Sequence, residues 1–386
     1  MNPHTKQTHT SSFGAKSADV RYGVGAKEVL LYKKLKNQIV QCHTCAHFCT
    51  ISPKQRGVCG VRENIEGKLY ALNYRKVIAV NIDPIEKKPL FHFLPGSYSL
   101  SIACVGCNLR CMNCQNYDIS QGFKTKKEVP GDDIPPEKIV EIALENKLPS
   151  ISYTYTEPTI FLEYALETMK LAKKAGLKNI FVSNGFMSEE SAKLVIPYLD
   201  ANNIDIKGWF SAAPKGRPLR LEDEARASPT ENGRDDFYQK NCGAKLKPIL
   251  DTAKLMKKSG VWVEITTLVI PTLSDSEEMF KGIAKFIKKE LGPETPWHIS
   301  RFSGDISWKL KHLPETPIES LERGWKIGKE TGLKYVYTGN ISGINSENTI
   351  CPKCNEIAIN RTNYIIHRHD KNGKCPKCKA DLSIIE

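Results

Sequence analysis

The sequence predicts an α/β protein built on a partial (β/α) barrel, with a small cysteine-rich module before the barrel and a zinc ribbon after it. Strand-like and helix-like segments alternate from Leu100 to Thr338, a pattern that produces a parallel sheet covered by helices. In addition, twelve of the thirteen cysteines fall into three groups of four, and only Cys242 stands alone. Disulfides are rare in cytosolic proteins, so these groups indicate bound metal.

Changes in these patterns define four regions. Residues 1–25 are polar and are expected to form a disordered tail, and residues 26–96 form the cysteine-rich module. Within this module we expect a short amphipathic helix at 26–35 and a small β-module at 68–82. The barrel occupies 97–339 and the zinc ribbon 340–386. Residues 211–236 carry many charges and three prolines, so they are expected to be a mobile insertion at the barrel rim.

The barrel elements follow from hydrophobic periodicity and from glycine and proline positions. Pro158 suits the first turn of a helix, and Gly176 and Gly260 suit positions just past helix ends. Strands are expected at 99–103, 150–155, 179–183, 203–207, 261–269, 297–302 and 334–338. Helices are expected between them, at 136–147, 158–174, 188–199, 244–259, 275–290 and 317–331.

The loop after the first strand carries the most informative motif. Cys104 is followed by Cys107, Cys111 and Cys114, and the last three form C-x3-C-x2-C. Closely spaced thiolates suit zinc and iron–sulfur centres, and three of them would leave one iron of a four-iron cube open to a cofactor. The alternative is a structural zinc knuckle that uses all four cysteines, Cys104 included.

Polar residues end the later strands of the predicted barrel. Functional groups in such barrels gather at the carboxyl ends of the strands, so we expect these side chains to face the cysteine loop. Each alone is more often a satisfied structural group, but five such strand ends in register indicate a cofactor site. The residues are Glu157, Ser183, Asn184, Asp205, Lys207, Glu264 and His298, with Arg301 beside the last.

The other two cysteine groups predict further metal sites. Cys42, Cys45, Cys49 and Cys59 could hold zinc or a second cluster, with His43 and His47 as substitute ligands. Cys351, Cys354, Cys375 and Cys378 form two C-x2-C knuckles, which strongly indicate a zinc ribbon. The basic residues of this ribbon, which include Arg361 and Arg368, would also allow nucleic-acid binding, although a structural ribbon docked on the barrel is the preferred interpretation.

Nearly the whole chain resembles the AmmeMemoRadiSam-system radical SAM enzymes, relatives of the pyruvate formate-lyase activating enzymes. The matching stretches are the cysteine pattern at 42–64, D-P-I-E-K-K-P-L-F-H-F-L-P-G-S at 83–97, G-C-N-L-R-C-M-N-C-Q-N-Y-D-I-S at 106–120, Y-T-Y-T-E-P at 153–158, N-I-D-I-K at 203–207, and the terminal ribbon. The resemblance implies a barrel of the radical SAM type.

The resemblance also implies site roles. Cys107, Cys111 and Cys114 would ligate a 4Fe-4S cluster, with Cys104 as a non-ligand neighbour. The residues that would line the S-adenosyl-L-methionine pocket are Glu157, Ser183, Asn184, Asp205 and Lys207. The cluster would reductively cleave this cofactor to a 5′-deoxyadenosyl radical, which abstracts hydrogen from a substrate, for which a protein is one candidate. The sequence departs from the family pattern in three places. Asn113 stands where the family usually has an aromatic residue, and the other two are the S-G-D-I-S run after the sixth strand and the 211–236 insertion.

The composition and charge of the chain limit the location and the binding partners that are expected. No apolar run approaches the ~20 residues of a membrane helix, and residues 1–25 lack the apolar stretch of a signal peptide, so a cytoplasmic protein is expected. The net charge of +13 favours an acidic electron donor, flavodoxin or ferredoxin. The alternatives are a glycyl-radical-enzyme activase specifically, a metal-bound nucleic-acid-binding protein, and an electron carrier with two clusters. Nucleic acid is not the expected partner, because the basic residues are scattered over helix faces.

Overall fold

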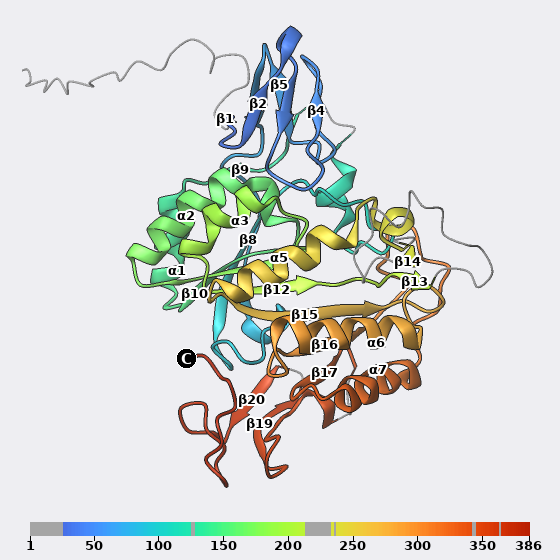
Figure 1. Ribbon diagram of the computed structural model, residues 1–386. Helices are drawn as coiled ribbons and strands as arrows, with labels where there is room; N and C mark the ends of the chain where they lie inside the picture. Colours follow the sequence, from blue (N-terminus) through green and yellow to red (C-terminus); the bar gives the residue numbers. More distant parts are fainter. Residues whose placement is uncertain (1–25, 125–127, 213–232, 235–236, 342–344, 363) are drawn as a thin grey trace, which may run out of the picture.

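A nine-stranded sheet forms the centre of the protein (Figure 1). The computed structural model describes residues 26–124, 128–212, 233–234, 237–341, 345–362 and 364–386. Parallel pairing joins β17(Val336–Gly339), β16(Trp297–Arg301), β15(Trp262–Val269), β12(Ala201–Asp205), β11(Lys178–Ser183), β10(Ser150–Tyr153) and β8(Tyr98–Cys104) in that order. These strands confirm the seven expected from the sequence.

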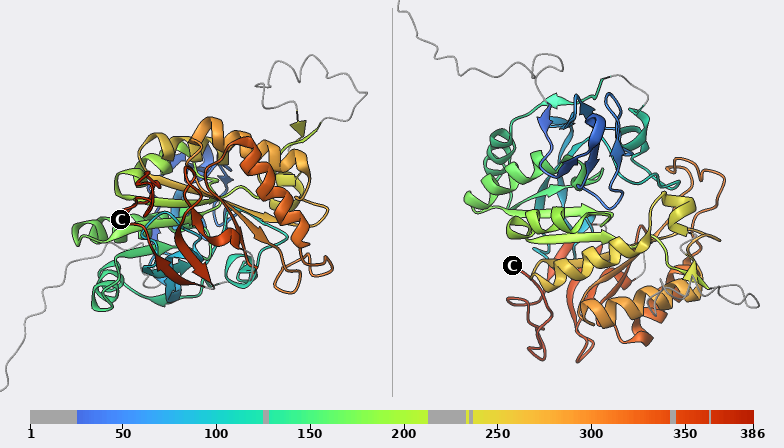
Figure 2. Two further views of the ribbon diagram at one scale, coloured as in Figure 1. Left: turned by 90° about the horizontal axis from the view of Figure 1, so that it is seen from below. Right: turned by 45° about the horizontal axis from the view of Figure 1, so that its top comes forward.

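Helices cover the outer face of this sheet, as two further views also show (Figure 2). They are α1(Pro136–Glu145), α2(Leu162–Lys174), α3(Glu189–Val195), α5(Leu246–Lys258), α6(Glu277–Phe286) and α7(Ile318–Thr331). Their apolar faces are buried against strands that are themselves buried on both faces, as all four residues of β10 are. Ser188 and Ser276 cap α3 and α6 by accepting hydrogen bonds from backbone N–H groups. The predicted partial (β/α) barrel is therefore confirmed.

Shorter helical turns extend or connect these elements. They are η2(Lys36–Gln38), η3(Ile85–Lys87), η4(Asp118–Gly122), η5(Pro158–Phe161), η6(Ile196–Tyr198), η7(Tyr238–Cys242), η8(Ile287–Leu291) and η9(Asn345–Glu347). Pro158 opens η5, which leads directly into α2, as the sequence suggested.

The cysteine-rich module consists of two small antiparallel sheets, seen at the top of Figure 1. One contains β1(Lys27–Glu28), β6(Lys68–Ala71) and β5(Arg62–Ile65), and the other β2(Tyr32–Lys34), β3(Val40–Cys42) and β4(Thr50–Ile51). The helix expected at 26–35 is wrong, because β1 pairs with β6 and β2 with β3. These long-range partners satisfy the backbone groups, and Val29 is buried against Leu69 of β6.

The segment 68–82 is also divided differently from the expectation. Only β6 belongs to the small module, whereas β7(Lys76–Pro84) pairs antiparallel with β8 and extends the barrel sheet, with β9(Asp132–Asp133) at its edge. The loop between β7 and β8, residues 85–97, consequently lies at the amino ends of the parallel strands.

The C-terminal ribbon contains β18(Thr349–Ile350), β19(Ile357–Thr362) and β20(Ile365–Arg368), and it lies at the opposite end of the sheet from the cysteine-rich module (Figure 1). It docks on the barrel through the 85–97 loop. The end of the chain returns to that loop, where Leu94 donates its N–H to the carbonyl oxygen of Ile385.

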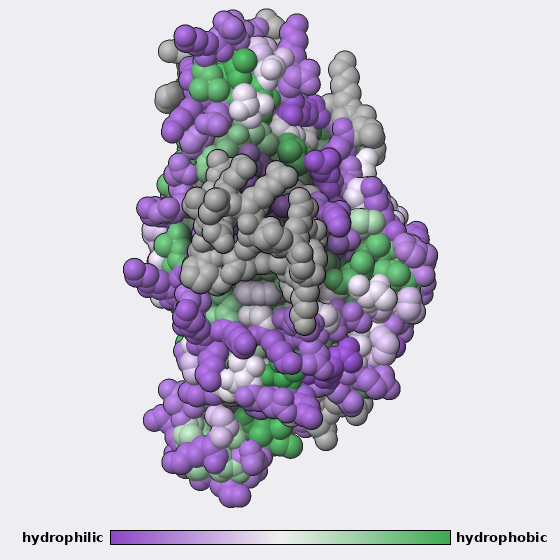
Figure 3. All heavy atoms as spheres, turned by 45° about the vertical axis from the view of Figure 1, so that its right-hand side comes forward, coloured by the Kyte–Doolittle hydropathy of each residue, from purple (hydrophilic) through white to green (hydrophobic). Residues whose placement is uncertain are grey.

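Two expectations fall mainly outside the described residues. The expected tail, residues 1–25, lies outside the described residues. Residues 213–232 and 235–236 of the expected insertion at 211–236 also lie outside them. The described parts of this insertion form the antiparallel pair β13(Ser211–Ala212) and β14(Gly233–Arg234). Among the helices of the described ranges, none has the length and apolar character needed to cross a membrane. The coloured part of the face in Figure 3 is mostly hydrophilic, with small hydrophobic patches between the polar residues.

Candidate cofactor site at the strand ends

A cavity of about 580 Å³ extends from the carboxyl ends of the parallel strands to the 85–97 loop. The structure brings nine of the residues singled out from the sequence to its wall: Cys107, Cys111, Cys114, Glu157, Ser183, Asn184, Asp205, Lys207 and His298. Eight of them come from the carboxyl ends of β10, β11 and β12 and from the loop after β8, because parallel strands present their carboxyl ends at one edge. His298 differs from the expected strand-end position, because it is the second residue of β16 and reaches the cavity from within the barrel.

The loop that carries Cys107, Cys111 and Cys114 is held by backbone hydrogen bonds from two sides. Arg110 and Met112 donate their N–H groups to carbonyl oxygens of the segment at 241–242, at 2.8 Å each. On the other side, the N–H of Lys309 donates to the Met112 carbonyl at 2.8 Å. These contacts hold the loop between the segment at 241–242 and Lys309.

Two further cysteines lie close to this loop without lining the cavity. Cys104 is fully buried at the end of β8 and packs in the barrel core. Cys242 is equally buried, and its contact with Cys111, together with burial, raises the pKa of the Cys111 thiol well above its ordinary value. The proximity of Cys242 to the loop has no signature in the sequence, because 127 other residues separate it from Cys114.

Glu157 is held in place by several donors. Its Oε1 atom accepts hydrogen bonds from the N–H and hydroxyl of Thr159 and from the hydroxyl of Ser183, at 3.1, 2.6 and 2.9 Å. Its Oε2 atom accepts from the N–H of Asn184 at 2.8 Å. Burial raises the pKa of this carboxyl, although the hydrogen bonds oppose the shift. The Oε2 atom retains capacity to accept from a ligand.

Asn184 joins this carboxylate to the cysteine loop. Its amide nitrogen donates to Oδ1 of Asn108 at 2.8 Å and lies 3.8 Å from the sulfur of Cys107. The side chain of Asn184 therefore bridges the end of β11 and the loop after β8.

Asp205 and Lys207 form an ion pair on the cavity wall. They occupy alternate positions at and just past the end of β12, so their side chains share one face. The Nζ–Oδ2 distance is 2.5 Å. Burial alone would lower the pKa of Lys207, but the charge of Asp205 holds it well above its ordinary value. The wall thus presents a carboxylate and an ammonium side by side.

Glu264 does not reach the cavity, which corrects the expected direct contact with a cofactor. It lies two residues before Thr266 on the same face of β15, one layer deeper in the barrel, and is fully buried. Its carboxylate accepts from the backbone N–H groups of Phe91 and His92 at 2.9 Å each, and it contacts Nε2 of His298 at 2.6 Å. Glu264 therefore ties the 85–97 loop to the barrel, and His298 is placed at the wall by this contact.

Arg301 also faces away from the cavity. Its guanidinium donates to the Thr316 carbonyl at 3.0 Å and pairs with Glu315 at 2.8 Å. The side chain anchors the loop that precedes α7.

The ribbon contributes to the far wall of the cavity, which sequence reasoning missed. Arg361 of β19 is buried on the cavity wall, donates to the Phe91 carbonyl at 2.7 Å and stacks over the Phe91 ring at 4.3 Å. Its Nε atom lies 3.8 Å from Glu86, whose second carboxylate oxygen is buried with no hydrogen-bond partner among the described residues. Arg361 is therefore not available to bind nucleic acid at the surface.

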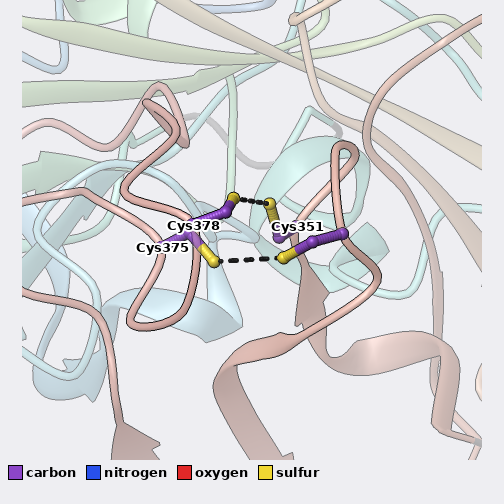
Figure 4. Close-up of side chains that lie close together, drawn as sticks. Cys351, Cys375 and Cys378 are labelled. Atoms are coloured by element: carbon purple, nitrogen blue, oxygen red, sulfur yellow. Dashed lines mark hydrogen bonds between the residues drawn. The ribbon is translucent and has the colours of Figure 1, made fainter.

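The ribbon cysteines meet around one point (Figure 4). The sulfur atoms of Cys351 and Cys378 lie 3.6 Å apart, and those of Cys354 and Cys375 lie 3.5 Å apart. All four sulfurs fall within 4.8 Å of one another, so this group could hold a metal ion. In the described part of the chain, it is the only set of three or more Cys, His, Asp or Glu residues gathered that tightly.

Comparison with known proteins identifies the family. The sequence model of the radical SAM superfamily matches residues 101–287, from β8 through α6. The uncharacterized protein MJ0808 of Methanocaldococcus jannaschii is 42% identical over 362 residues, which cover 93% of this chain and 99% of that protein.

The chain belongs to the radical SAM superfamily.

Other relatives of this radical SAM protein are more distant. The pyruvate formate-lyase-activating enzyme of Clostridium pasteurianum is 24% identical over 243 residues, covering 58% of this chain and 87% of that enzyme. A solved domain of a pyruvate formate-lyase activating enzyme from Bacteroides vulgatus matches 49% of this chain and 98% of its own, with 14% identity and a TM-score of 0.37. A radical SAM methyltransferase from Sphaerobacter thermophilus matches 64% of this chain and 67% of its own, with 11% identity and a TM-score of 0.43. The narrower AmmeMemoRadiSam family stays a prediction.

Proposed function

We propose that the protein is a radical enzyme in which Cys107, Cys111 and Cys114 hold a 4Fe-4S cluster beside an S-adenosyl-L-methionine pocket. The observation that carries the proposal is the single cavity in which these three cysteines face Glu157, Ser183, Asn184, Asp205 and Lys207. A cluster held there would supply the electron for reductive cleavage of S-adenosyl-L-methionine to a 5′-deoxyadenosyl radical, the species that would abstract hydrogen from the substrate.

The protein residues hold and orient the cofactor. The cofactor carries an ammonium and a carboxylate, and the wall offers a partner for each. Oε2 of Glu157 has room for a further donor, and Lys207 supplies a charged donor next to Asp205. The carbonyl oxygen of the Asn113 side chain is buried on the wall with no hydrogen-bond partner among the described residues. It would accept from the adenine amino group, in the place where relatives carry an aromatic residue.

The substrate would occupy the opposite end of the cavity, between the barrel and the ribbon. Glu86, Lys88, His298 and Arg361 reach the wall there, so this end offers charges of both signs. The free carboxylate oxygen of Glu86 is an acceptor for a substrate N–H or O–H group. A protein substrate would have to insert a single side chain or chain segment into this space.

Glycyl-radical activation is a narrower candidate, supported by the relative from Clostridium pasteurianum. Its test is the formation of a protein radical, detected by electron paramagnetic resonance, when pyruvate formate-lyase is added to the reduced enzyme with S-adenosyl-L-methionine. The nucleic-acid alternative is disfavoured, because Arg361 is buried and Arg368 is bonded to Asp370 and Glu386.

Anaerobic reconstitution with iron and sulfide, followed by dithionite and S-adenosyl-L-methionine, tests the main proposal. We expect 5′-deoxyadenosine from the parent protein and none from Cys111→Ala, which removes a cluster ligand. Cys104→Ala is the matched control, because Cys104 is buried beside the loop but away from the cavity, and it should retain cluster and product. Loss of the cluster in Cys104→Ala, with no product from the parent, would indicate a closed four-cysteine metal site instead.

We also propose that the ribbon metal is zinc. Four sulfurs about 2.3 Å from a tetrahedral zinc lie about 3.8 Å from one another. The separations of 3.5 and 3.6 Å between facing ribbon cysteines are close to this value. A site closed by four thiolates has no open position, so its role is structural.

A further inference from the structure

We propose that Cys42, Cys45, Cys49 and Cys59 hold a second iron–sulfur cluster of the four-iron type, and not zinc. The four residues come from three separate parts of the cysteine-rich module. Cys42 ends β3, Cys45 and Cys49 lie in the loop before β4, and Cys59 lies in the turn before β5. All four nevertheless line one small cavity of about 10 Å³, and three of them are buried.

Backbone contacts hold these segments in place. The N–H of Cys42 donates to the Cys49 carbonyl at 2.9 Å, and a bridge between Cys45 and Met187 ties the loop to the barrel. The N–H of Gly57 donates to the Arg62 carbonyl at 2.9 Å, which closes the turn that contains Cys59. A Cβ atom at Gly57 would lie 3.2 Å from the side chain of Ile51 and 3.7 Å from the Cys49 sulfur, so this turn packs closely against the loop that carries Cys49. The convergence of the four thiols is therefore built into the fold.

The separation of the four cysteine sulfur atoms distinguishes an iron–sulfur cluster from a zinc ion. Zinc draws its four sulfurs to about 2.3 Å from the metal, which leaves no room for a water-sized sphere between them. The cavity lined by the four cysteines admits such a sphere. A four-iron cube places its irons and sulfides between the cysteine sulfurs, so the thiolates must stand farther apart than around zinc.

The chain contains its own standards for this comparison. The sulfur atoms of the four ribbon cysteines lie within 4.8 Å of one another. The structure describes every cysteine of the sets at 42–59 and 107–114, and in neither set do three sulfur atoms lie that close together. The N-terminal set thus shares its wide spacing with the proposed catalytic cluster and differs from the ribbon.

The surroundings suit a buried anionic group. The guanidinium of Arg62, 1% exposed, lies on the cavity wall and pairs with Glu163 at 2.8 Å. The thiol of Cys42 donates to the Thr44 hydroxyl at 3.4 Å, and a hydroxyl in this position can donate to a thiolate in turn. Four thiolates would carry negative charge into this site, and a buried charge requires nearby compensation. The Arg62–Glu163 pair is neutral overall, so it favours the anion only through its guanidinium, which is the part of the pair on the cavity wall.

The module also contacts the loop of the first cluster. The ammonium of Lys124 donates to the carbonyl oxygens of Val58 and Cys107, at 3.0 and 3.3 Å, and Nε2 of His47 lies 2.7 Å from the Asn108 carbonyl. Val58 and His47 both line the smaller cavity. Because four protein ligands leave no open iron, the second cluster would not bind S-adenosyl-L-methionine.

Metal and sulfide analysis of full-length variants tests this assignment. After anaerobic reconstitution, the parent should contain roughly eight irons and eight sulfides per chain and about one zinc. The triple variant Cys107→Ala/Cys111→Ala/Cys114→Ala should keep roughly four irons and four sulfides, with the visible absorption of a cluster. The matched variant Cys42→Ala/Cys45→Ala/Cys49→Ala should lose the N-terminal cluster and keep the other.

Zinc in place of iron at the N-terminal set would overturn the proposal, and so would a triple variant that folds, by circular dichroism, but binds neither iron nor sulfide. If the variants do not fold, Mössbauer spectroscopy of the parent decides the matter. We expect two clusters, of which added S-adenosyl-L-methionine perturbs one; a single cluster in fully loaded parent protein would refute the assignment. Failure to form 5′-deoxyadenosine would contradict the proposed function but would leave these metal counts unchanged.

Discussion

Replacement of Glu264 by leucine should destabilise the protein far more than it weakens cofactor binding. Glu264 is fully buried and accepts hydrogen bonds from Phe91, His92 and the Trp262 indole, all at 2.9 Å, besides its contact with His298. Leucine fills a similar volume but accepts no hydrogen bond. Two buried backbone N–H groups would then lose their partner, and so would the indole N–H of the half-buried Trp262.

The size of the effect follows from these contacts. Each buried donor left unsatisfied costs about 1–3 kcal/mol, and breaking a buried charged contact costs about 3–5 kcal/mol in total after relaxation. We therefore expect a loss of about 3–5 kcal/mol, a large part of the ~5–15 kcal/mol by which proteins are stable. The exposed Glu277 on α6, which pairs with Lys281, provides the control: Glu277→Leu should change stability by about 0.5 kcal/mol or less.

The pH dependence gives a second signature. Burial by itself would raise the pKa of Glu264, but the hydrogen bond and charge of His298 lower it to about 2 from 4.5. A carboxyl with a depressed folded-state pKa contributes stability that is fully present above pH 4.5 and is lost as the pH falls toward 2. The variant should lack this contribution, so its stability should fall less steeply than that of the parent across this range.

Urea unfolding followed by tryptophan fluorescence measures the effect, since Trp262 is itself a partner of Glu264. The affinity of the folded variant for S-adenosyl-L-methionine is measured separately. An unchanged urea midpoint together with lost cofactor binding would refute this account, because it would place Glu264 in the cofactor site and not behind its wall.

Three further predictions concern the other sites. Cys375→Ser should reduce zinc content from about one to none and lower the unfolding temperature, because a tetrahedral site loses one of its four thiolates; full retention of zinc would contradict the ribbon assignment. Glu157→Ala should keep the iron–sulfur cluster but weaken S-adenosyl-L-methionine binding, measured by equilibrium dialysis, by about 1.5–3 kcal/mol if one charge-assisted hydrogen bond is lost; an unchanged affinity would exclude a direct contact. Reduction by an acidic flavodoxin or ferredoxin should slow as ionic strength rises, because the net charge of +13 would attract it; rates independent of salt would count against electrostatic steering.

The features that the sequence predicted correctly depend on residues that are close together in the chain. Cysteine spacing depends on neighbours in the chain, so C-x3-C-x2-C after a strand indicated a cluster loop, and the paired knuckles indicated the ribbon. Periodicity is also local, and it located all seven parallel strands and the helices between them. Because parallel strands align their carboxyl ends, the positions of Glu157, Ser183 and Asp205 on one wall followed from the strand assignments.

The features that the sequence did not predict depend on contacts between segments that are far apart in the chain. The segment at 26–35 has a helix-like pattern, yet pairing with β6 and β3 makes it extended. The depth of Glu264 within the barrel depends on strand register, which placed Thr266 at the wall and Glu264 behind it. Arg361 reaches the cavity only because the ribbon folds back onto the loop at Phe91, 270 residues earlier. Periodicity and motif spacing describe which elements form, whereas the contacts between distant segments determine which side chains finally share a site.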